Sequence, residues 1–254
     1  MLQHRVIPAL LLRKNGLVKT TRFKDPKYVG DPINAIRIFN EKEVDELMVL
    51  DITATKERRE PNYEMIEQFA GECFMPLTYG GGIRTVLQAQ RIFASGVEKI
   101  CIQTAALENL QLVREMADRF GSQSIMVSLD IKRTWLGRAQ AFAAAQVKLL
   151  STDWLKLLSD LVEAGAGEVL LNAVDKDGTL SGPDLDLIRQ ASEHVDVPLI
   201  AIGGVSSLVD IKSAVDAGAS AVAAGAFFVY HGPHRAVLIT YPKYRELERL
   251  FSLK

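Results

Sequence analysis

The sequence predicts one α/β domain, a single (β/α)8 barrel (TIM barrel) covering residues 1–254, and three observations support this prediction. Short apolar runs alternate with segments of helical periodicity, which is typical of a parallel sheet covered by helices. The length of 254 residues is that of an ordinary barrel with eight such units. The two halves of the chain also match each other at a fixed offset, as expected for a barrel built from two four-strand halves.

Eight strands are expected, because a strand buried on both faces is continuously apolar instead of alternating. The expected strands cover residues 5–12, 46–52, 74–79, 99–103, 125–130, 168–173, 197–202 and 221–225. Residues 84–95 and 205–217 carry apolar side chains at three- and four-residue spacing, so helices are expected there. No glycine- or serine-rich linker divides the chain, which favours a single domain.

The internal repeat has an offset of 122 residues. PLTYGGGI at 76–83 matches PLIAIGGV at 198–205, and GVEKICIQTAAL at 96–107 matches GASAVAAGAFF at 218–228. Glycines therefore follow the third and seventh strands in equivalent places. Because glycine lets backbone N–H groups approach an anion closely, the repeat favours two phosphate sites over two ordinary turns. The loop DKDGT at 175–179 is either a further part of this site or a plain Asp-Gly turn.

The composition excludes several classes of function. Lysine plus arginine (30) nearly balances aspartate plus glutamate (31), so nucleic acid is not an expected partner. Cys73 and Cys101 lie in or beside apolar runs without metal-ligand spacing, which predicts reduced core residues and no metal site. The apolar stretch near the N-terminus is too short to span a bilayer and is followed by no cleavage site. A cytoplasmic protein without a membrane segment is therefore expected.

Charged residues stand at the beginnings of four expected strands. Arg5 opens the first strand, Glu46 the second, Lys99 the fourth and Glu168 the sixth. Alternating charges at the mouth of an apolar barrel can close it as a ring of salt bridges. Stability is the usual role of this face of the fold. A partly buried ion ring is an inefficient stabiliser, however, so a gate is the favoured interpretation.

Taken together, these motifs resemble the HisF family, the cyclase subunit of imidazole glycerol phosphate synthase, over nearly the whole chain. The matching segments are IP at 7–8, GDP at 30–32, DEL at 45–47, LDITA at 50–54, PLTYGGGIR at 76–84, DRFGSQ at 118–123, GAGE at 165–168, DKDGT at 175–179 and GG at 203–204. The resemblance implies a barrel that receives ammonia from a glutaminase, HisH, and uses it to cleave and cyclise a bisphosphate substrate. No cofactor or metal ion is implied.

The resemblance also implies the roles of individual residues. Gly82 and Thr104 would hold one phosphate of a phosphorylated small molecule. The residues around the other phosphate would be Asp177, Gly178, Gly203, Gly204, Ala224 and Gly225. Lys19 is similar to the lysine of the family's flexible substrate loop, where Asp51 would also lie. The ring of Arg5, Glu46, Lys99 and Glu168 would gate an ammonia tunnel lined by residues such as Thr78, Val127 and Leu170, and Glu98 would contact the glutaminase.

The chain departs from the family's pattern at one of two catalytic aspartates. Asp130, at the end of the fifth expected strand, is retained, but Leu11 stands where the first strand should carry its partner. Leucine cannot exchange a proton, whereas cyclisation needs proton transfers on both sides of the substrate. Residues 134–154 also lack the family's glycine-rich, basic hairpin, and Gln103 replaces an asparagine.

Three functions remain open at this point. The segments 24–47, 60–76 and 227–242 resemble a glycosyl amidation-associated branch of the family, WbuZ. This branch implies ammonia delivery, beside an ATP-dependent amidating synthetase, to a surface-polysaccharide (lipopolysaccharide) sugar. The C-terminal stretch would then either dock that third protein or form an ordinary last helix. The alternatives are a working cyclase of histidine biosynthesis, with Asp130, Asp51 or Asp177 replacing the lost base, and a non-catalytic scaffold that activates the glutaminase.

Overall fold

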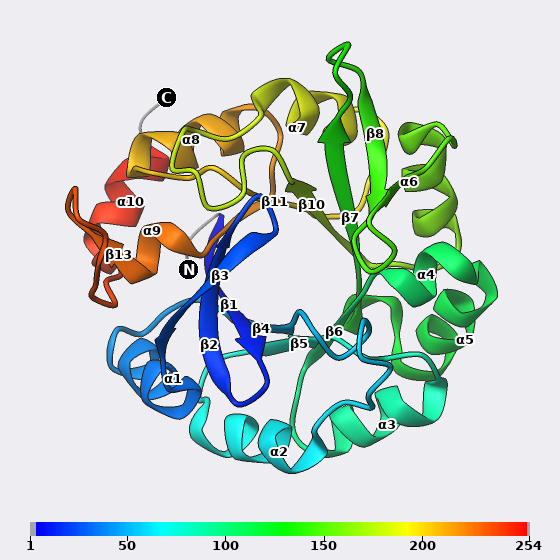
Figure 1. Ribbon diagram of the computed structural model, residues 1–254, viewed down its shortest axis with the longest axis horizontal. Coiled ribbons are helices and arrows are strands. Elements are labelled where there is room, and N and C mark those ends of the chain that lie inside the picture. Colours follow the sequence, from blue (N-terminus) through cyan, green and yellow to red (C-terminus); the bar gives the residue numbers. More distant parts are fainter. Residues whose placement is uncertain (1–3, 253–254) are drawn as a thin grey trace.

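The computed structural model describes residues 4–252 and has a closed barrel of eight parallel strands at its centre (Figure 1). The barrel strands are β1 (Arg5–Arg13), β4 (Leu47–Asp51), β5 (Leu77–Gly80), β6 (Lys99–Ile102), β7 (Ile125–Arg133), β10 (Glu168–Ala173), β11 (Leu199–Ile202) and β12 (Ala221–Ala224). Each strand pairs with the next along the chain, and β12 pairs with β1 to close the cylinder. The predicted barrel is confirmed.

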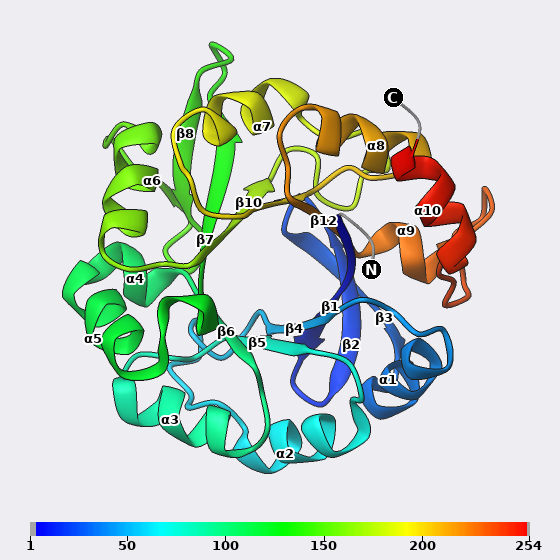
Figure 2. The same ribbon diagram turned by 180° about the vertical axis from the view of Figure 1, so that it is seen from behind.

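Helices surround the barrel on its outside, as the view from behind shows (Figure 2). They are α1 (Pro32–Glu41), α2 (Tyr63–Glu72), α3 (Val86–Ala94), α4 (Thr104–Glu108), α5 (Leu110–Phe120), α6 (Trp154–Glu163), α7 (Leu185–Ser192), α8 (Leu208–Asp216), α9 (Ala226–Val229) and α10 (Tyr244–Ser252). Side-chain caps fix the beginnings of most of them. Ser207 and Asp210, for example, form a reciprocal capping box on α8.

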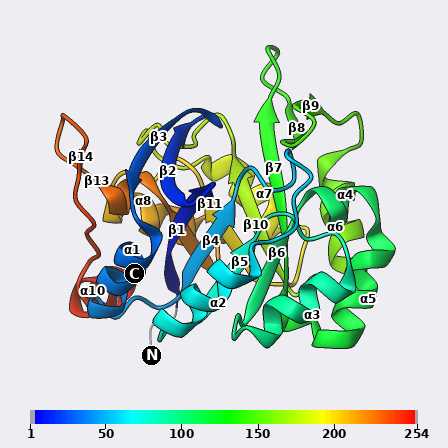
Figure 3. The ribbon, with the colours of Figure 1, turned by 60° about the horizontal axis from the view of Figure 1, so that its bottom comes forward.

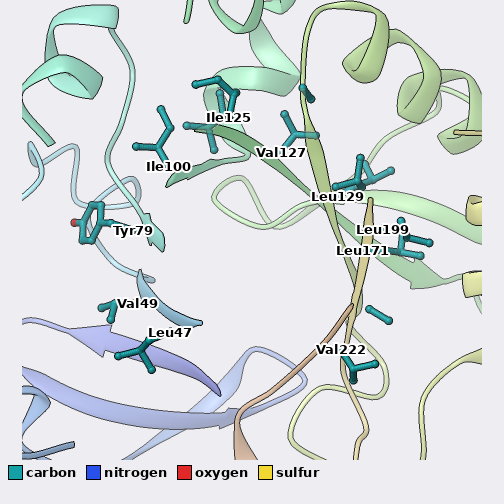
Figure 4. Close-up of a cluster of buried hydrophobic side chains, with 14 of the residues drawn as sticks. Leu47, Val49, Tyr79, Ile100, Ile125, Val127, Leu129, Leu171, Leu199 and Val222 are labelled. Carbon is teal, nitrogen blue, oxygen red and sulfur yellow. The ribbon is translucent and has the colours of Figure 1, made fainter. Parts of the chain in front are cut away.

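Two separate apolar clusters result from the alternation of side chains along the strands. The larger cluster joins the outer faces of the strands to the helices (Figure 4). The smaller one fills the barrel and consists of Ile7, Ala9, Met48, Cys101, Met126, Leu170, Ile200, Ala221 and Ala223. Thr78 and Leu170 face the interior as predicted. The placement of Val127 in the bore was wrong, because its side chain packs outward in the larger cluster.

The strand boundaries follow the prediction closely with one exception. β5 begins at Leu77 and not at residue 74, and Phe74 is 88% exposed. Its backbone N–H is bonded to the side chain of Asn40, so this residue belongs to the connection after α2 and not to the sheet. The expected helices at 84–95 and 205–217 correspond to α3 and α8, each of which begins two to three residues later behind a side-chain cap.

Two hairpins rise above the end of the barrel where the strands terminate (Figure 3). One contains β2 (Gly16–Thr21) and β3 (Lys24–Gly30), and the other joins the extended β7 to β8 (Ala139–Ala143), with β9 (Lys148–Leu149) beside it. The chain therefore does form a hairpin in this region, although residues 134–154 lack the glycine-rich, basic sequence that the family resemblance implies. Gly137 adopts a left-handed conformation (φ 78°) that closes the turn between β7 and β8. A small ladder, β13 (Tyr230–His231) with β14 (Ala236–Val237), precedes α10.

Residues 4–252 hold neither a candidate membrane-spanning helix nor a candidate metal site. None of the helices there combines the length and the apolar character needed to cross a bilayer. Likewise, no cluster of histidine, cysteine, aspartate and glutamate suited to a metal ion lies in that part of the chain.

Candidate functional site

Asp130 lies at the carboxyl end of β7 and faces the barrel interior. Met126, on the same face of the strand, belongs to the inner cluster, so the alternation directs Ser128 and Asp130 inward as well. The Asp130 carboxylate is buried and accepts a hydrogen bond from the side-chain amide of Gln103. Asn172, its ladder partner on β10, is also buried.

The environment of Asp130 favours its protonated form. Burial raises the pKa of this carboxyl to about 7, although the amides of Gln103 and Asn172 act in the opposite direction. A carboxyl with a pKa near neutrality can both take up and release a proton at physiological pH. Asp130 is therefore suited to acid–base work.

Replacement of Asp130 by asparagine tests this pKa through stability. Between pH 3.8 and 7 the folded chain retains a proton that the unfolded chain releases, so Asp130 lowers stability as pH rises through this window. Above pH 7 we expect Asp130→Asn to have a higher free energy of unfolding than the native chain, by up to about 4 kcal/mol. Urea denaturation measures this difference. The advantage should shrink to near zero at pH 4. A difference that did not vary with pH would contradict the raised pKa.

Leu11 occupies the equivalent inward position on β1. Ile7 and Ala9, four and two residues earlier, belong to the inner cluster, and Leu11 shares their face. It pairs with Leu50 of β4 and with Val18 of β2. The position on β1 that is equivalent to Asp130 on β7 therefore carries an apolar side chain and not a carboxyl.

The residues of the predicted second phosphate site lie around one cavity of about 30 Å³. All six of its predicted residues line the cavity: Asp177, Gly178, Gly203, Gly204, Ala224 and Gly225. Gly203 and Gly204 adopt left-handed backbone conformations with φ of 110° and 91°. A side chain on Gly204 would collide with the backbone of Gly182, so only glycine fits there.

Lys19 reaches into the same cavity from β2. Its ammonium group donates a hydrogen bond of 2.6 Å to the carbonyl of Ala9, and the whole side chain is buried. Burial lowers the pKa of Lys19 to about 8, and the carboxylate of Asp177 partly offsets this effect. Asp177 in turn accepts a hydrogen bond from the hydroxyl of Thr20, which ties the β2–β3 hairpin to the loop after β10.

The residues of the predicted first phosphate site, Gly82 and Thr104, do not line this cavity. The backbone N–H of Gly82 donates to the hydroxyl of Thr55, at 3.2 Å. A Cβ on Gly82 would lie 3.0 Å from the carbonyl oxygen of Arg59, so the loop after β4 packs directly on this glycine. Thr104 begins α4 and is partly exposed.

The side chain of Asp51 makes its hydrogen bonds within the loop that follows β4. Its carboxylate accepts hydrogen bonds from the backbone N–H groups of Thr53 and Ala54, at 2.9 and 3.0 Å. It also pairs with Arg59 at 3.3 Å. These contacts shape the connection between β4 and α2.

At the opposite end of the barrel, the predicted ring of four charges is present. Glu46 contacts Arg5 at 2.5 Å and Lys99 at 3.2 Å, and Glu168 contacts Arg5 at 2.8 Å and Lys99 at 3.0 Å. Glu46 also accepts a bond from the hydroxyl of Thr78. Burial alone would lower the pKa of Arg5, but the two carboxylates outweigh it and raise that pKa. The four side chains thus form a cycle of ion pairs at the N-terminal end of the barrel.

The side chains of Tyr241 and Asp45 both bind the backbone of Val6 near this end, which the sequence did not predict. The hydroxyl of Tyr241 donates to the carbonyl of Val6 at 2.9 Å, and Asp45 accepts from the N–H of Val6 at 3.1 Å. The C-terminal segment is thereby attached beside the ring. Glu98, the predicted glutaminase contact, is exposed and accepts a bond from the N–H of Leu77.

Asn172 is the functional candidate that sequence reasoning missed. Its side-chain oxygen is buried without a hydrogen-bond partner among the described residues. The signal for it was present in the sequence, because Asn172 is a polar residue near the end of the largely apolar strand EVLLNA and alternates with Leu170 and Glu168. Strand alternation places these three on the interior face.

Known proteins match this chain over most of its length. Residues 5–234 match the family model described as "Histidine biosynthesis protein". A Pseudomonas aeruginosa protein provisionally named imidazole glycerol phosphate synthase subunit hisF2 is 52% identical, over 98% of this chain and 99% of its own length. A Vibrio vulnificus protein provisionally named subunit hisF3 is 46% identical, over 100% and 98%. The Streptomyces coelicolor protein named subunit HisF is 38% identical, over 88% and 89%.

Proposed function

Because this chain belongs to the histidine biosynthesis protein family and within it to the HisF group, we propose that it is the barrel subunit of a cytoplasmic glutamine amidotransferase complex. In this complex a HisH-like glutaminase docks at the charged end of the barrel, near Glu98. Ammonia passes through the bore and leaves at the carboxyl ends of the strands. An ATP-dependent amidating synthetase then uses it to modify a sugar of a surface polysaccharide.

The observation that carries this proposal is the contrast between the two ends of the barrel. The ring of Arg5, Glu46, Lys99 and Glu168 is complete at one end. At the other end the position equivalent to Asp130 carries no carboxyl, because Leu11 occupies the inward position on β1. A chain of this kind keeps the means to admit ammonia but has lost half of the acid–base pair needed for cyclisation.

The proposed route for ammonia through the packed interior runs along the side of the barrel where the side chains are smallest. Ala221 and Ala223 of β12 pair with Arg5 and Ile7 of β1, and Ala9 faces the same interior. These small side chains run from the ring toward Leu11. An apolar route keeps ammonia from the bulk water in which most of it becomes ammonium.

The relatives support a role apart from ordinary cyclisation. The proteins that carry the name of the synthase subunit only provisionally, including hisF2, hisF3 and the HisF of Leptospira interrogans, are 46% to 52% identical to this chain. Those of Alkaliphilus metalliredigens and Streptomyces coelicolor, named HisF without that reservation, are 37% and 38% identical.

Deletion of the gene tests the proposal in the cell. We expect the deletion strain to grow without histidine and to make a surface polysaccharide that lacks an amidated sugar, as read by mass spectrometry. A requirement for histidine would instead identify the chain as the working cyclase.

Complementation with two variants then separates a conduit from a scaffold. Ala223→Val narrows the bore, whereas Ala201→Val makes the same change in the outer core of β11. For a conduit, Ala223→Val should lose most of the amidation and regain it in medium with high ammonium, while Ala201→Val should behave like the native chain. Equal amidation by both variants would favour a scaffold that conducts no ammonia.

A further inference from the structure

The ladder between β1 and β4 stops short of the end of the barrel that carries the ring of charges. Paired residues of these two strands begin at Ala9 and Met48, so Val6 lies beyond the end of their ladder. Val6 is fully buried. Its backbone N–H and C=O therefore need hydrogen-bond partners from another part of the chain.

Two side chains supply these partners. The carboxylate of Asp45 accepts a hydrogen bond from the N–H of Val6 at 3.1 Å. The hydroxyl of Tyr241 donates to the carbonyl of Val6 at 2.9 Å and also lies 3.3 Å from the carboxylate of Asp45. Burial raises the pKa of Asp45, whereas the bonds from Val6 and Tyr241 act in the opposite direction. The Tyr241 hydroxyl thus stabilises both the strand and the carboxylate.

These bonds lie one residue away from the ring on two segments of the chain. Arg5 precedes Val6 on β1, and Glu46 follows Asp45 just before β4. Arg5 contacts Glu46 and Glu168 through two different guanidinium nitrogens. Because a guanidinium holds its donors in a fixed fork, both contacts depend on the position of the β1 backbone.

Tyr241 belongs to a segment beyond the part of the chain that matches the family model, which ends at residue 234. The aromatic ring of Tyr241 packs on that of Phe228, with centroids 5.3 Å apart, and the N–H of Thr240 donates to the carbonyl of Phe228. Leu247 of α10, which follows, is 1% exposed. The segment is therefore held in place by contacts other than the Tyr241 hydroxyl.

We propose that Tyr241 is a positioning residue: acting through Asp45 and the backbone of Val6, it holds Arg5 in the ring and so links the C-terminal segment to the entry of ammonia. The link to ammonia rests on the proposed function, whereas the positioning of Arg5 does not. Tyr241→Phe removes the hydroxyl and retains the aromatic ring that packs on Phe228. Tyr244→Phe makes the same change at an exposed position of α10 and is the matched control.

Hydrogen–deuterium exchange of backbone amides in the purified chain, read by NMR, tests the positioning. In Tyr241→Phe we expect the amide of Val6 to exchange about tenfold faster than in the native chain, as expected when a hydrogen bond of its partner is lost. The amide of Leu171, in the β10 ladder, should exchange at the native rate, and Tyr244→Phe should change neither. Unchanged exchange at Val6, or equal acceleration at Leu171, would overturn the proposal.

Complementation of the deletion strain tests the link to ammonia. Cells with Tyr241→Phe should make at least twofold less amidated polysaccharide than cells with Tyr244→Phe, and high ammonium should remove the difference. Equal amidation by the two variants, with faster exchange at Val6, would overturn the link. A deletion strain that requires histidine, together with faster exchange at Val6, would instead refute the proposed function and leave the positioning of Arg5 standing.

Discussion

Supplied with an ammonium salt and the bisphosphate substrate of imidazole glycerol phosphate synthase, the purified chain is expected to turn over on the order of 10² to 10⁴ times more slowly than a cyclase with both aspartates. The reason is the apolar side chain of Leu11. Asp130, with its pKa raised to about 7, can serve one side of a substrate, but no carboxyl faces it from the Leu11 position. Formation of the product, followed by chromatography, gives the rate.

Substitution at Leu11 makes this prediction specific. Leu11→Asp restores a carboxylate and should raise the ammonium-dependent rate by at least tenfold, whereas the nearly isosteric Leu11→Asn cannot transfer a proton and should not. Asp130→Asn should remove what activity the native chain has. A native rate within tenfold of an ordinary cyclase, unaffected by these changes, would mean that Asp51 or Asp177 performs the missing step.

Much of the barrel could be predicted because buried strands appear in the sequence as continuous apolar runs. The eight barrel strands are apolar on both faces, so their positions could be identified without a structure. The beginning of β5 was misplaced because Phe74 and Met75 extend the apolar run without entering the sheet. Length and apolarity cannot separate a buried strand from the connection that leads into it.

The hairpins could not be predicted by the same criteria. β3 is exposed along most of its length, and its sequence KDPKYVG carries no apolar periodicity. Its position depends instead on contacts distant in sequence, such as the bond from Arg22 N–H to the carbonyl of Asp177. The hairpin places Lys19 in the cavity, so that part of the site follows from tertiary structure and not from local pattern.

The site residues likewise include some that the sequence could predict and some that depend on tertiary contacts. The glycines after β11 and the four charges of the ring were predictable, because each stands at a strand end whose position was known. The engagement of Gly82 by Thr55 and the attachment of Tyr241 beside Arg5 were not, since neither involves a recognisable spacing.

Removal of one charge from the ring is expected to have the largest effect on stability. Glu46 is 2% exposed and is bonded to Arg5, Lys99 and Thr78. Glu46→Gln leaves two partly buried cations facing one carboxylate, which should lower the free energy of unfolding by about 3–5 kcal/mol. Urea denaturation monitored by circular dichroism measures this change.

The matched control is the exposed pair of Arg37 and Glu72, which is joined at 2.7 Å on the outer helices. Glu72→Gln removes the same charge from a bidentate pair and should lower the free energy of unfolding far less than Glu46→Gln does, because water screens exposed ion pairs. Equal effects of the two substitutions would mean that the ring is as well solvated as the surface, and the interpretation of a closed end would fail.

A double variant tests whether the ring is needed for stability or for another function. Glu46→Gln together with Lys99→Met leaves the single pair of Arg5 with Glu168, and we expect it to recover at least half of the lost stability. Since apolar replacements of buried ion pairs are often neutral or stabilising, a recovery to the native value would show that the chain does not need the ring to fold. Four charges held at the end of an apolar bore would then require another use. Loss of glutamine-dependent amidation in a stable double variant, with ammonium-dependent amidation intact, would identify that use as control of ammonia entry.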